Sequence, residues 1–193
     1  MDGRSGVIVA GGRSVRMGGV EKTVLEVAGV PLIRRVAERL LTVTDEVVVN
    51  CRADQRAAIE DALAGLGPRF AIEETPDRGP VGGIEAGLDA VETEYAAVVA
   101  ADMPLLDPGL VSYLFERAAG HDAAVPRPSE WFEPLHAVYR AEPMIAACRR
   151  ALQRENPRIH EPLSSLDRVV VDREDLLERA SLDSFESADT TEY

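Results

Sequence analysis

Short apolar runs that alternate with helix-like segments are the feature that most constrains the fold of this chain. Continuous apolar runs of this length are typical of strands buried on both faces. The sequence predicts such strands at 7–10, 46–50, 69–74 and 95–101, and helices over about 31–41, 54–66 and 84–91, with another helix starting at Asp107. Strands and helices in this order predict an α/β fold with a largely parallel sheet.

Right-handed crossovers between parallel strands place the carboxyl ends of those strands at one edge of the sheet. The loops after residues 10, 50, 74 and 101 are therefore expected to gather there, where open α/β sheets bind ligands. Two local expectations accompany this layout: Asp54 caps the second helix, and residues 75–84 form a Gly/Pro-rich loop.

The second half of the chain is predicted to hold strands at 122–127, 133–140 and 168–172, with helices at 143–154 and 174–180. Residues 156–166 are expected to be mostly loop. The tail from 184 to 193 is polar, and we expect it to be disordered in the absence of a ligand. Neither a repeat nor a low-complexity linker interrupts the chain, so residues 1–193 are expected to form a single domain.

The first predicted strand runs directly into a glycine-rich, basic segment. Residues 11–22 read Gly-Gly-Arg-Ser-Val-Arg-Met-Gly-Gly-Val-Glu-Lys. A glycine-rich loop after a buried strand brings backbone N–H groups close to a phosphate, and Arg13, Arg16 and Lys22 add positive charge. Lys22 is the single lysine in a chain with 21 basic residues. Its position favours a phosphate-binding role over chance survival on a surface.

This segment matches neither of two common nucleotide-binding patterns. A P-loop places its lysine directly after a glycine, whereas Val20 and Glu21 separate Gly19 from Lys22. The dinucleotide pattern G-x-G-x-x-G is broken at Gly11-Gly12-Arg13. The segment is therefore expected to hold the phosphates of a nucleotide in some other way.

Polar residues follow the other strands that end at the same edge. Asp102 could hold Mg²⁺ against phosphate oxygens, or could be a turn or cap residue; a phosphate loop at the same edge favours the metal role. Glu74 or Asp77 could accept the N1–H and 2-amino hydrogen bonds of a guanine, or be a solvated turn acid. Asn50 could contact the base or ribose, or cap the next turn.

Composition limits the classes of partner. The net charge of −13 argues against non-specific binding to nucleic acid or to an anionic membrane. Acidic excess with almost no lysine suggests adaptation to high salt. Cys51 and Cys148 show no metal or redox spacing, so buried thiols in a reducing cytoplasm are expected. No apolar run is long enough to cross a membrane, and no signal peptide is evident. The chain contains no recognisable covalent nucleophile, which favours direct, metal-assisted phosphoryl-type chemistry.

The glycine-rich segment resembles the Ala-Gly-Gly-x-x-x-Arg-Met-Gly…Lys pattern of nucleotidyltransferases with a nucleotide-diphospho-sugar-transferase-like fold. Further stretches are similar to one family within it, the molybdenum cofactor guanylyltransferases: 47–50 (Val-Val-Val-Asn), 79–84 (Gly-Pro-Val-Gly-Gly-Ile), 101–106 (Ala-Asp-Met-Pro-Leu-Leu) and 133–140 (Glu-Pro-Leu-His-Ala-Val-Tyr-Arg). The resemblance covers essentially the whole chain. It implies a Rossmann-like, three-layer α/β/α sandwich, with GTP binding in the N-terminal part and acceptor binding in the C-terminal part.

The family resemblance also implies an activity, which is transfer of GMP from GTP to molybdenum-bound molybdopterin with release of pyrophosphate. It implies GTP and Mg²⁺ as ligands, a cytoplasmic location, and transient contact with other cofactor-biosynthesis proteins or molybdoenzymes. Lys22, Arg16 and Asp102 would be catalytic, with Asp102 binding the metal. The implied GTP-binding residues are Val9, Ala10, Gly11, Gly12, Lys22, Asn50, Asp77 and Asp102.

One departure from the family pattern concerns the acceptor. The family usually ends in Asn-x-Asn-Thr-Pro, which helps to hold the pterin, whereas this chain has Ser187 and Asp189 in place of the asparagines. Related readings are a nucleotidyltransferase for adenosylcobinamide phosphate, 2-phospholactate or a sugar phosphate, a cytidylyltransferase, or a non-catalytic nucleotide-binding relative. Lys22 and Asp102 together argue against the non-catalytic reading.

Overall fold

A computed structural model of the chain describes residues 3–11, 24–73, 75 and 78–188. Its centre is a seven-stranded sheet in the order β5-β4-β1-β6-β8-β7-β9. The strands, in chain order, are β1 (Ser5–Val9), β4 (Glu46–Cys51), β5 (Arg69–Ile72), β6 (Tyr95–Ala100), β7 (Ala123–Arg127), β8 (His136–Arg140) and β9 (Arg168–Asp172). Strand β8 runs antiparallel to both of its neighbours and the remaining pairs are parallel, so the predicted mostly parallel sheet is confirmed.

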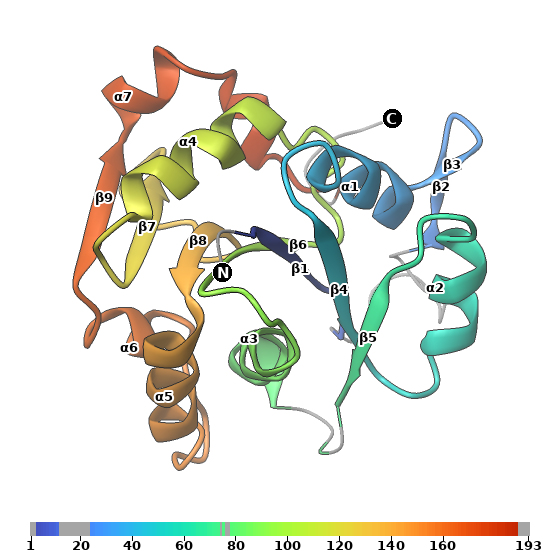
Figure 1. The fold of residues 1–193 in the computed structure, drawn as a ribbon, viewed down its shortest axis with the longest axis horizontal. Helices are drawn as coiled ribbons and strands as arrows, with labels where there is room; N and C mark the ends of the chain where they lie inside the picture. Colours follow the sequence, from blue (N-terminus) through green and yellow to red (C-terminus); the bar gives the residue numbers. More distant parts are fainter. Residues whose placement is uncertain (1–2, 12–23, 74, 76–77, 189–193) are drawn as a thin grey trace.

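Helices cover both faces of the sheet and make the three layers seen in Figure 1. One face carries α1 (Leu32–Leu40), α2 (Arg56–Ala62), α4 (Pro108–Ala118) and α7 (Arg173–Leu177); the other carries α3 (Gly79–Asp89), α5 (Ala141–Ala151) and α6 (His160–Leu163). A small hairpin of β2 (Glu26–Val27) and β3 (Val30–Pro31) precedes α1. Because helices bury both faces of the central strands, those strands read as continuous apolar runs.

The register of the central strands brings three loops to one level. Val9 of β1 lies opposite Asn50 of β4 on one side and opposite Ala100 of β6 on the other. The loops that follow β1, β4 and β6 therefore leave the sheet side by side. The reversed direction of β8 adds its first residue, His136, to the same edge, because His136 pairs with Val99 near the end of β6.

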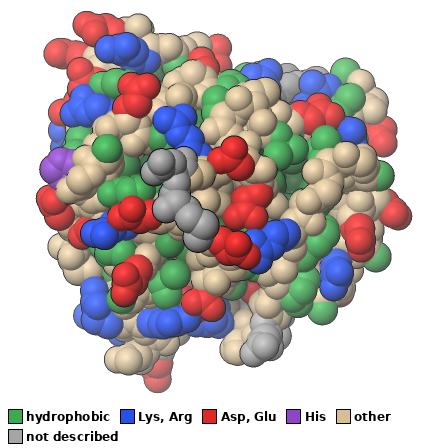
Figure 2. Space-filling view, viewed as in Figure 1, with side chains coloured by type: hydrophobic (Ala, Val, Ile, Leu, Met, Phe, Trp, Pro, Cys, Tyr) green, Lys and Arg blue, Asp and Glu red, His purple; other side chains and the backbone are tan. Residues whose placement is uncertain are grey.

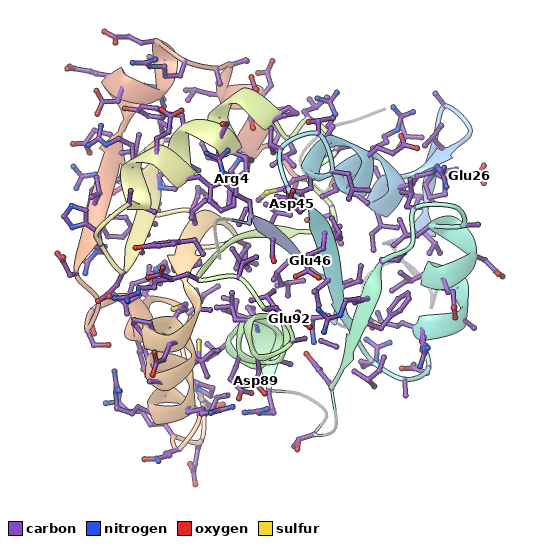
Figure 3. The ribbon with its side chains drawn as sticks, in the orientation of Figure 1. Arg4, Glu26, Asp45, Glu46, Asp89 and Glu92 are labelled. Atoms are coloured by element: carbon purple, nitrogen blue, oxygen red, sulfur yellow. The ribbon has the colours of Figure 1, made fainter. Side chains whose placement is uncertain are left out.

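The opposite edge, at the amino ends of β1 and β4, is a network of paired polar groups. The Ser5 hydroxyl donates to Glu46 (2.7 Å), and Arg69 donates to the other oxygen of that carboxylate (3.1 Å). The backbone N–H of Arg4 donates to Asp45 (2.8 Å). Acidic side chains and arginines gather on this face of the molecule (Figure 2), and Figure 3 labels Arg4, Asp45 and Glu46 together around the strand ends.

Helix α3 starts earlier than the sequence suggests. Residues 79–83 were expected to be a loop, but they form the first turns of α3, with Pro80 in its first turn. The glycines of this helix allow close packing on the sheet rather than loop flexibility. A Cβ added at Gly87 would lie 2.3 Å from Cγ1 of Val7, and one at Gly83 would lie 2.8 Å from Cγ1 of Val9.

Other expectations also need correction. Asp54 does not cap α2; it forms an ion pair with Arg52 (3.0 Å), and Gln55 occupies the cap position. The stretch 156–166 is mostly loop, as expected, with the short helix α6 within it. The expected disorder of the tail is wrong for its first part, because Leu182–Phe185 forms the 3₁₀ turn η2, in which Ser184 is buried.

Both cysteines, Cys51 and Cys148, are buried and form no disulfide, as the sequence predicts. Within the described part of the chain, none of the helices combines the length and the apolar character needed to span a membrane.

Candidate active site at the carboxyl edge of the sheet

Two side chains from the turn after β4 hold the start of the glycine-rich segment. The Nε2 of Gln55, which is 2% exposed, donates to the carbonyl of Ala10 (3.2 Å), and Arg52 donates to the carbonyl of Gly11 (3.3 Å). The N–H of Ala10 donates to the carbonyl of Asn50 (2.9 Å). These contacts fix the backbone at the point where the segment leaves β1. Neither side chain was predicted from the sequence, although their position directly after the second strand was a usable signal.

Asn50 presents a buried acceptor between two glycines. Its side chain is fully buried, and its Nδ2 donates to the carbonyl of Ala71 (3.3 Å). Its Oδ1 has no hydrogen-bond partner among the residues that the structure describes. A Cβ would lie 3.2 Å from this oxygen at Gly11 and 2.6 Å at Gly83. Since an unsatisfied buried acceptor costs about 1–3 kcal/mol, this arrangement suits a ligand that brings an N–H or O–H donor.

Glu73, at the end of β5, approaches the same point. Its Oε1 would lie 2.6 Å from a Cβ placed on Gly11, so the glycine leaves room for this carboxylate. The sequence analysis weighed Glu74 and Asp77 as the base-binding acid, and both lie outside the described residues. Glu73 was not considered, although it is adjacent to Glu74 and belongs to the same strand end.

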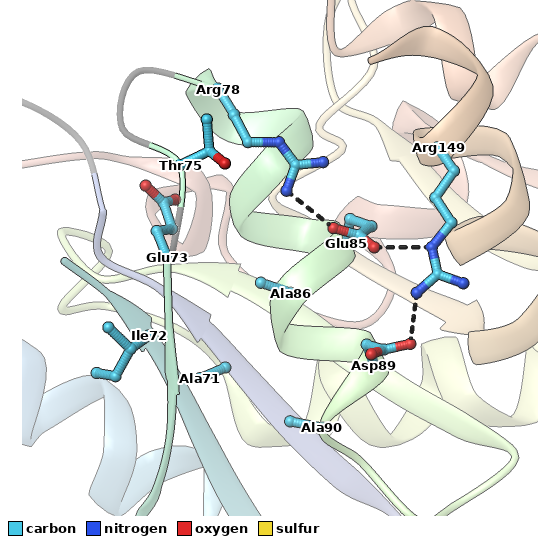
Figure 4. A pocket seen from close by; sticks show the side chains of 10 residues that line it. All are labelled: Ala71, Ile72, Glu73, Thr75, Arg78, Glu85, Ala86, Asp89, Ala90 and Arg149. Atoms are coloured by element: carbon cyan, nitrogen blue, oxygen red, sulfur yellow. Dashed lines mark hydrogen bonds and ion pairs between the residues drawn. The ribbon is translucent and has the colours of Figure 1, made fainter. Parts of the chain in front are cut away.

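A cavity of about 520 Å³ adjoins this corner, between β5, α3 and α5 (Figure 4). Glu85 of α3, which is largely buried, accepts hydrogen bonds from Arg78 (3.1 Å) and Arg149 (2.8 Å), and Asp89 also pairs with Arg149 (2.8 Å). The two guanidinium groups thus face two carboxylates, which leaves little net charge on this wall. The residues around the cavity are Ala71, Ile72, Glu73, Thr75, Arg78, Glu85, Ala86, Asp89, Ala90 and Arg149.

Asp102 stands in the turn that follows β6. Its side chain is partly buried, and its carboxylate makes no hydrogen bond or ion pair with another residue in the described part of the chain. It does not cap α4; that role belongs to Asp107, whose Oδ1 accepts from the N–H groups of Gly109 (2.7 Å) and Leu110 (3.3 Å). The cap reading of Asp102 is therefore wrong, and its carboxylate stands at the edge of the sheet where β1 and β4 also end.

The donor chemistry of Asp102 fits Mg²⁺. This ion prefers hard oxygen ligands and usually takes one or two carboxylates together with substrate phosphates and water. Among the described residues, no group of three or more His, Cys, Asp or Glu side chains could enclose a metal ion. A single carboxylate suits an ion that arrives with its nucleotide.

The structure thus brings several of the predicted site residues to one edge: Val9, Ala10, Gly11, Asn50 and Asp102. Gly12, Arg13, Arg16, Lys22 and Asp77 lie outside the described residues. Their assigned roles stay predictions.

Comparisons with known proteins identify the family of the chain. The sequence model of the MobA-like NTP transferase domain matches residues 6–169. The chain belongs to this family. It is 65% identical, over 192 residues, to a probable molybdenum cofactor guanylyltransferase of Natronomonas pharaonis, covering 100% of this chain and 95% of the relative. A protein of the same name from Haloferax mediterranei is 39% identical over 188 residues, covering 97% and 90%.

Solved structures also match the fold. The molybdopterin-guanine dinucleotide biosynthesis protein A of Archaeoglobus fulgidus superposes with a TM-score of 0.80 at 28% identity, covering 96% of this chain and 92% of that one. A protein of Aquifex aeolicus gives a TM-score of 0.73 at 20% identity, covering 97% and 94%, which shows the fold alone. The resemblance to nucleotidyltransferases, and the fold that it implies, are confirmed.

Proposed function

We propose that this chain transfers GMP from GTP to molybdenum-bound molybdopterin, giving the guanine dinucleotide cofactor and pyrophosphate. The observation that carries this proposal is the 65% identity, over the full chain, to a relative named as a probable molybdenum cofactor guanylyltransferase. The arrangement of Asn50, Gly11 and Asp102 at one sheet edge supports the same assignment, because it offers a nucleoside contact beside a carboxylate suited to a metal–phosphate complex.

In the reaction, a terminal phosphate oxygen of the acceptor attacks the α-phosphorus of GTP. One P–O bond forms there, the P–O bond toward the β-phosphate breaks, and pyrophosphate leaves with that electron pair. Negative charge grows on the α-phosphoryl oxygens and on the leaving group, so preorganised positive charge lowers the barrier. Lys22 and Arg16 are assigned to these phosphates, and the backbone from Val9 to Gly12 to the nucleotide.

The guanosine part is assigned to the corner around Asn50. The unsatisfied Oδ1 of Asn50 would accept a hydrogen bond from the guanosine, and an acid of the segment after β5 would accept from the guanine N1–H and 2-amino groups. Asp77 is the acid predicted for this role, with Glu74 as the other candidate. Glu73 lines the corner itself, with its carboxyl group close to Gly11.

Asp102 would hold Mg²⁺, which when bound supplies charge neutralisation for the triphosphate. The acceptor is assigned to the C-terminal half of the chain, where Ser187 and Asp189 replace the asparagines expected for the pterin site. A cytoplasmic location and transient contacts with proteins that supply or receive the cofactor complete the proposal.

Pyrophosphate release tests this function directly. GTP, CTP and ATP are each supplied with molybdenum-bound molybdopterin and, separately, with adenosylcobinamide phosphate. We expect release with GTP and the pterin acceptor only. Higher activity with CTP would refute guanylyl transfer, and activity with adenosylcobinamide phosphate alone would refute the acceptor. Tight GTP binding without release for either acceptor would point to a non-catalytic relative.

A further inference from the structure

The C-terminal segment 184–188 contacts the loop that carries Asp102. The family match ends at residue 169, so this segment lies beyond it. The N–H of Ala188 donates to the backbone carbonyl of Asp102 (2.9 Å), and the N–H of Asp107 donates to the Oγ of Ser184 (2.9 Å). Both ends of the loop from 102 to 107 are therefore tied to one short segment, which we call the C-terminal clasp (residues 184–188).

His136 of β8 contacts two residues of the clasp, Ser184 and Phe185. The His136 ring is fully buried, and its centroid lies 4.6 Å from that of Phe185 at an interplanar angle of 48°. Its Nε2 lies 3.5 Å from the Oγ of Ser184, and its Nδ1 has no partner among the described residues. Ser184 is itself only 2% exposed. A buried hydroxyl with a backbone N–H on one side and an imidazole on the other has little freedom to move.

The rest of the loop is held by the packing of Met103 and Leu106, which are both buried, and by two further hydrogen bonds. The N–H of Ala101 donates to the carbonyl of Val9 (3.2 Å), and Arg39 donates to the carbonyl of Leu106 (3.0 Å). Between Ala101 and Leu106, the backbone carbonyl of Asp102 accepts its hydrogen bond from Ala188. Loss of the clasp would therefore remove the hydrogen bond to the Asp102 carbonyl and loosen the backbone at this residue, although its neighbours Ala101 and Met103 stay buried.

We propose that the C-terminal clasp positions Asp102 for the metal–triphosphate complex, with Ser184 and Ala188 as positioning residues. The inference rests on the proposed function, since it takes Asp102 as the metal-binding carboxylate. Displacement of a catalytic group by about 1 Å can cost about 10²-fold in rate, so a loop anchor of this kind affects catalysis without touching substrate. A merely structural clasp would lower stability and leave the metal requirement unchanged.

The first test removes the Ser184 hydroxyl in the full chain. Ser184→Ala is compared with Ser164→Ala, because Ser164 lies in the turn after α6, away from the clasp, where its Oγ donates to the carbonyl of Glu161 (2.7 Å). Pyrophosphate release is measured against Mg²⁺ concentration. Loss of one hydrogen bond predicts that Ser184→Ala needs about fivefold more Mg²⁺ for half-maximal rate. We expect the Mg²⁺ curve of Ser164→Ala to match the wild type, and GTP binding in EDTA to be the same in both variants.

The second test removes the N–H donor of residue 188 without deleting a buried side chain. Ala188→Pro deletes the N–H that bonds the Asp102 carbonyl, whereas Ala188→Gly retains it. We expect a similar, about fivefold, rise in the Mg²⁺ requirement for Ala188→Pro, and a wild-type requirement for Ala188→Gly. Thermal unfolding of each variant confirms that it is folded.

Two results separate failure of this inference from failure of the proposed function. If Asp102→Asn raises the Mg²⁺ requirement but Ser184→Ala and Ala188→Pro leave it unchanged, the clasp does not position Asp102. If Asp102→Asn itself has the wild-type Mg²⁺ dependence, the metal assignment of Asp102 fails, and the inference fails with it.

Discussion

The two edges of the central sheet differ in how far their buried polar groups are hydrogen-bonded. At the amino edge the groups pair with one another: Ser5 donates to Glu46, Thr93 donates to Ser5 (2.8 Å), and Arg69 pairs with both Glu46 and Glu92. At the carboxyl edge, two buried atoms lack a partner among the described residues, Oδ1 of Asn50 and Nδ1 of His136.

This difference suggests that the amino ends of the strands contribute mainly to stability and the carboxyl ends mainly to ligand binding. Paired groups stabilise the amino ends of β1 and β4, and the unpartnered buried atom found at this edge among the described residues, Nε of Arg168, lies away from them at the start of β9. At the carboxyl edge, Gly11 and Gly83 leave room where side chains would otherwise fill the space. Substitutions at the carboxyl edge are therefore expected to cost more in activity than in stability, and those at the amino edge the reverse.

The largest expected effect is at Asp102. Asp102→Asn keeps the shape of the side chain but removes its charge, and should lower turnover about 10²-fold or more, the scale of one preorganised electrostatic contact. Asp107→Asn is the matched control, because asparagine caps a helix about as well as aspartate. Steady-state pyrophosphate release measures both. Wild-type turnover in a folded Asp102→Asn would exclude a catalytic role for this carboxylate.

The next effect concerns acid stability at the carboxyl edge. Burial lowers the pKa of His136 from 6.5 to about 4, although the nearby Asp107 charge acts in the opposite direction. The unfolded chain therefore takes up this proton first. Stability is fully present above about pH 6.5 and falls as the pH drops toward 4, by up to about 3 kcal/mol.

Urea unfolding at pH 7 and pH 4.5 checks this expectation. His136→Gln should be less stable than wild type at pH 7 but should lose less stability on acidification. His160→Gln, at an exposed position, should keep the wild-type pH dependence. An unchanged slope in His136→Gln would show that other groups cause the acid sensitivity.

A smaller effect is expected from filling the corner beside Asn50. Gly83→Ala would place a Cβ against Oδ1 of Asn50, so we expect kcat/KM for GTP to fall about tenfold, with some loss of stability from overpacking. Gly87→Ala is the control on the same helix, since its Cβ would meet Val7 away from the edge. It should lower the melting temperature without a comparable loss in kcat/KM. Equal losses of kcat/KM in both variants would show that displacement of α3, rather than filling of the corner beside Asn50, lowers activity.

The smallest effect is expected at the amino edge. Burial by itself raises the pKa of Glu46, but the Ser5 hydroxyl and the Arg69 guanidinium together lower it below its ordinary value. The contribution of Glu46 to the free energy of unfolding is therefore present above the pKa that this group has in the unfolded chain. It is lost as the pH falls through the lower pKa of the folded state. Glu46→Gln should cost about 1 kcal/mol in urea unfolding at pH 7 and leave kcat unchanged. A large loss of activity would contradict the division between the edges.

The parts of the fold that depend on local pattern could be predicted from the sequence. Apolar runs, their alternation with helices, and the N-cap at Asp107 are features of neighbouring residues. The start of α3 could not be predicted, because glycine favours loops locally. In this helix, Gly83 is required because it packs closely on Val9 and Asn50.

The candidate site divides in the same way. Val9, Asn50 and Asp102 stand at strand ends, so the strand predictions alone bring them to one edge. Gln55 and Ser184 could not be predicted, because they act on backbone groups 45 and 77 residues away in the sequence. Arg16, Lys22 and Asp77 lie outside the described residues, so their roles stay predictions.

The register of β1 with β6 has a consequence for behaviour in concentrated salt. Backbone hydrogen bonds between uncharged groups link the two strands, and the bond from Ala101 to the carbonyl of Val9 continues this ladder past the strand ends. Dissolved ions screen exposed ion pairs, such as that between Arg69 and Glu92, but have little effect on a buried amide ladder. The separation of β1 and β6, about 4.8 Å for adjacent strands, is therefore a length that ionic strength does not alter.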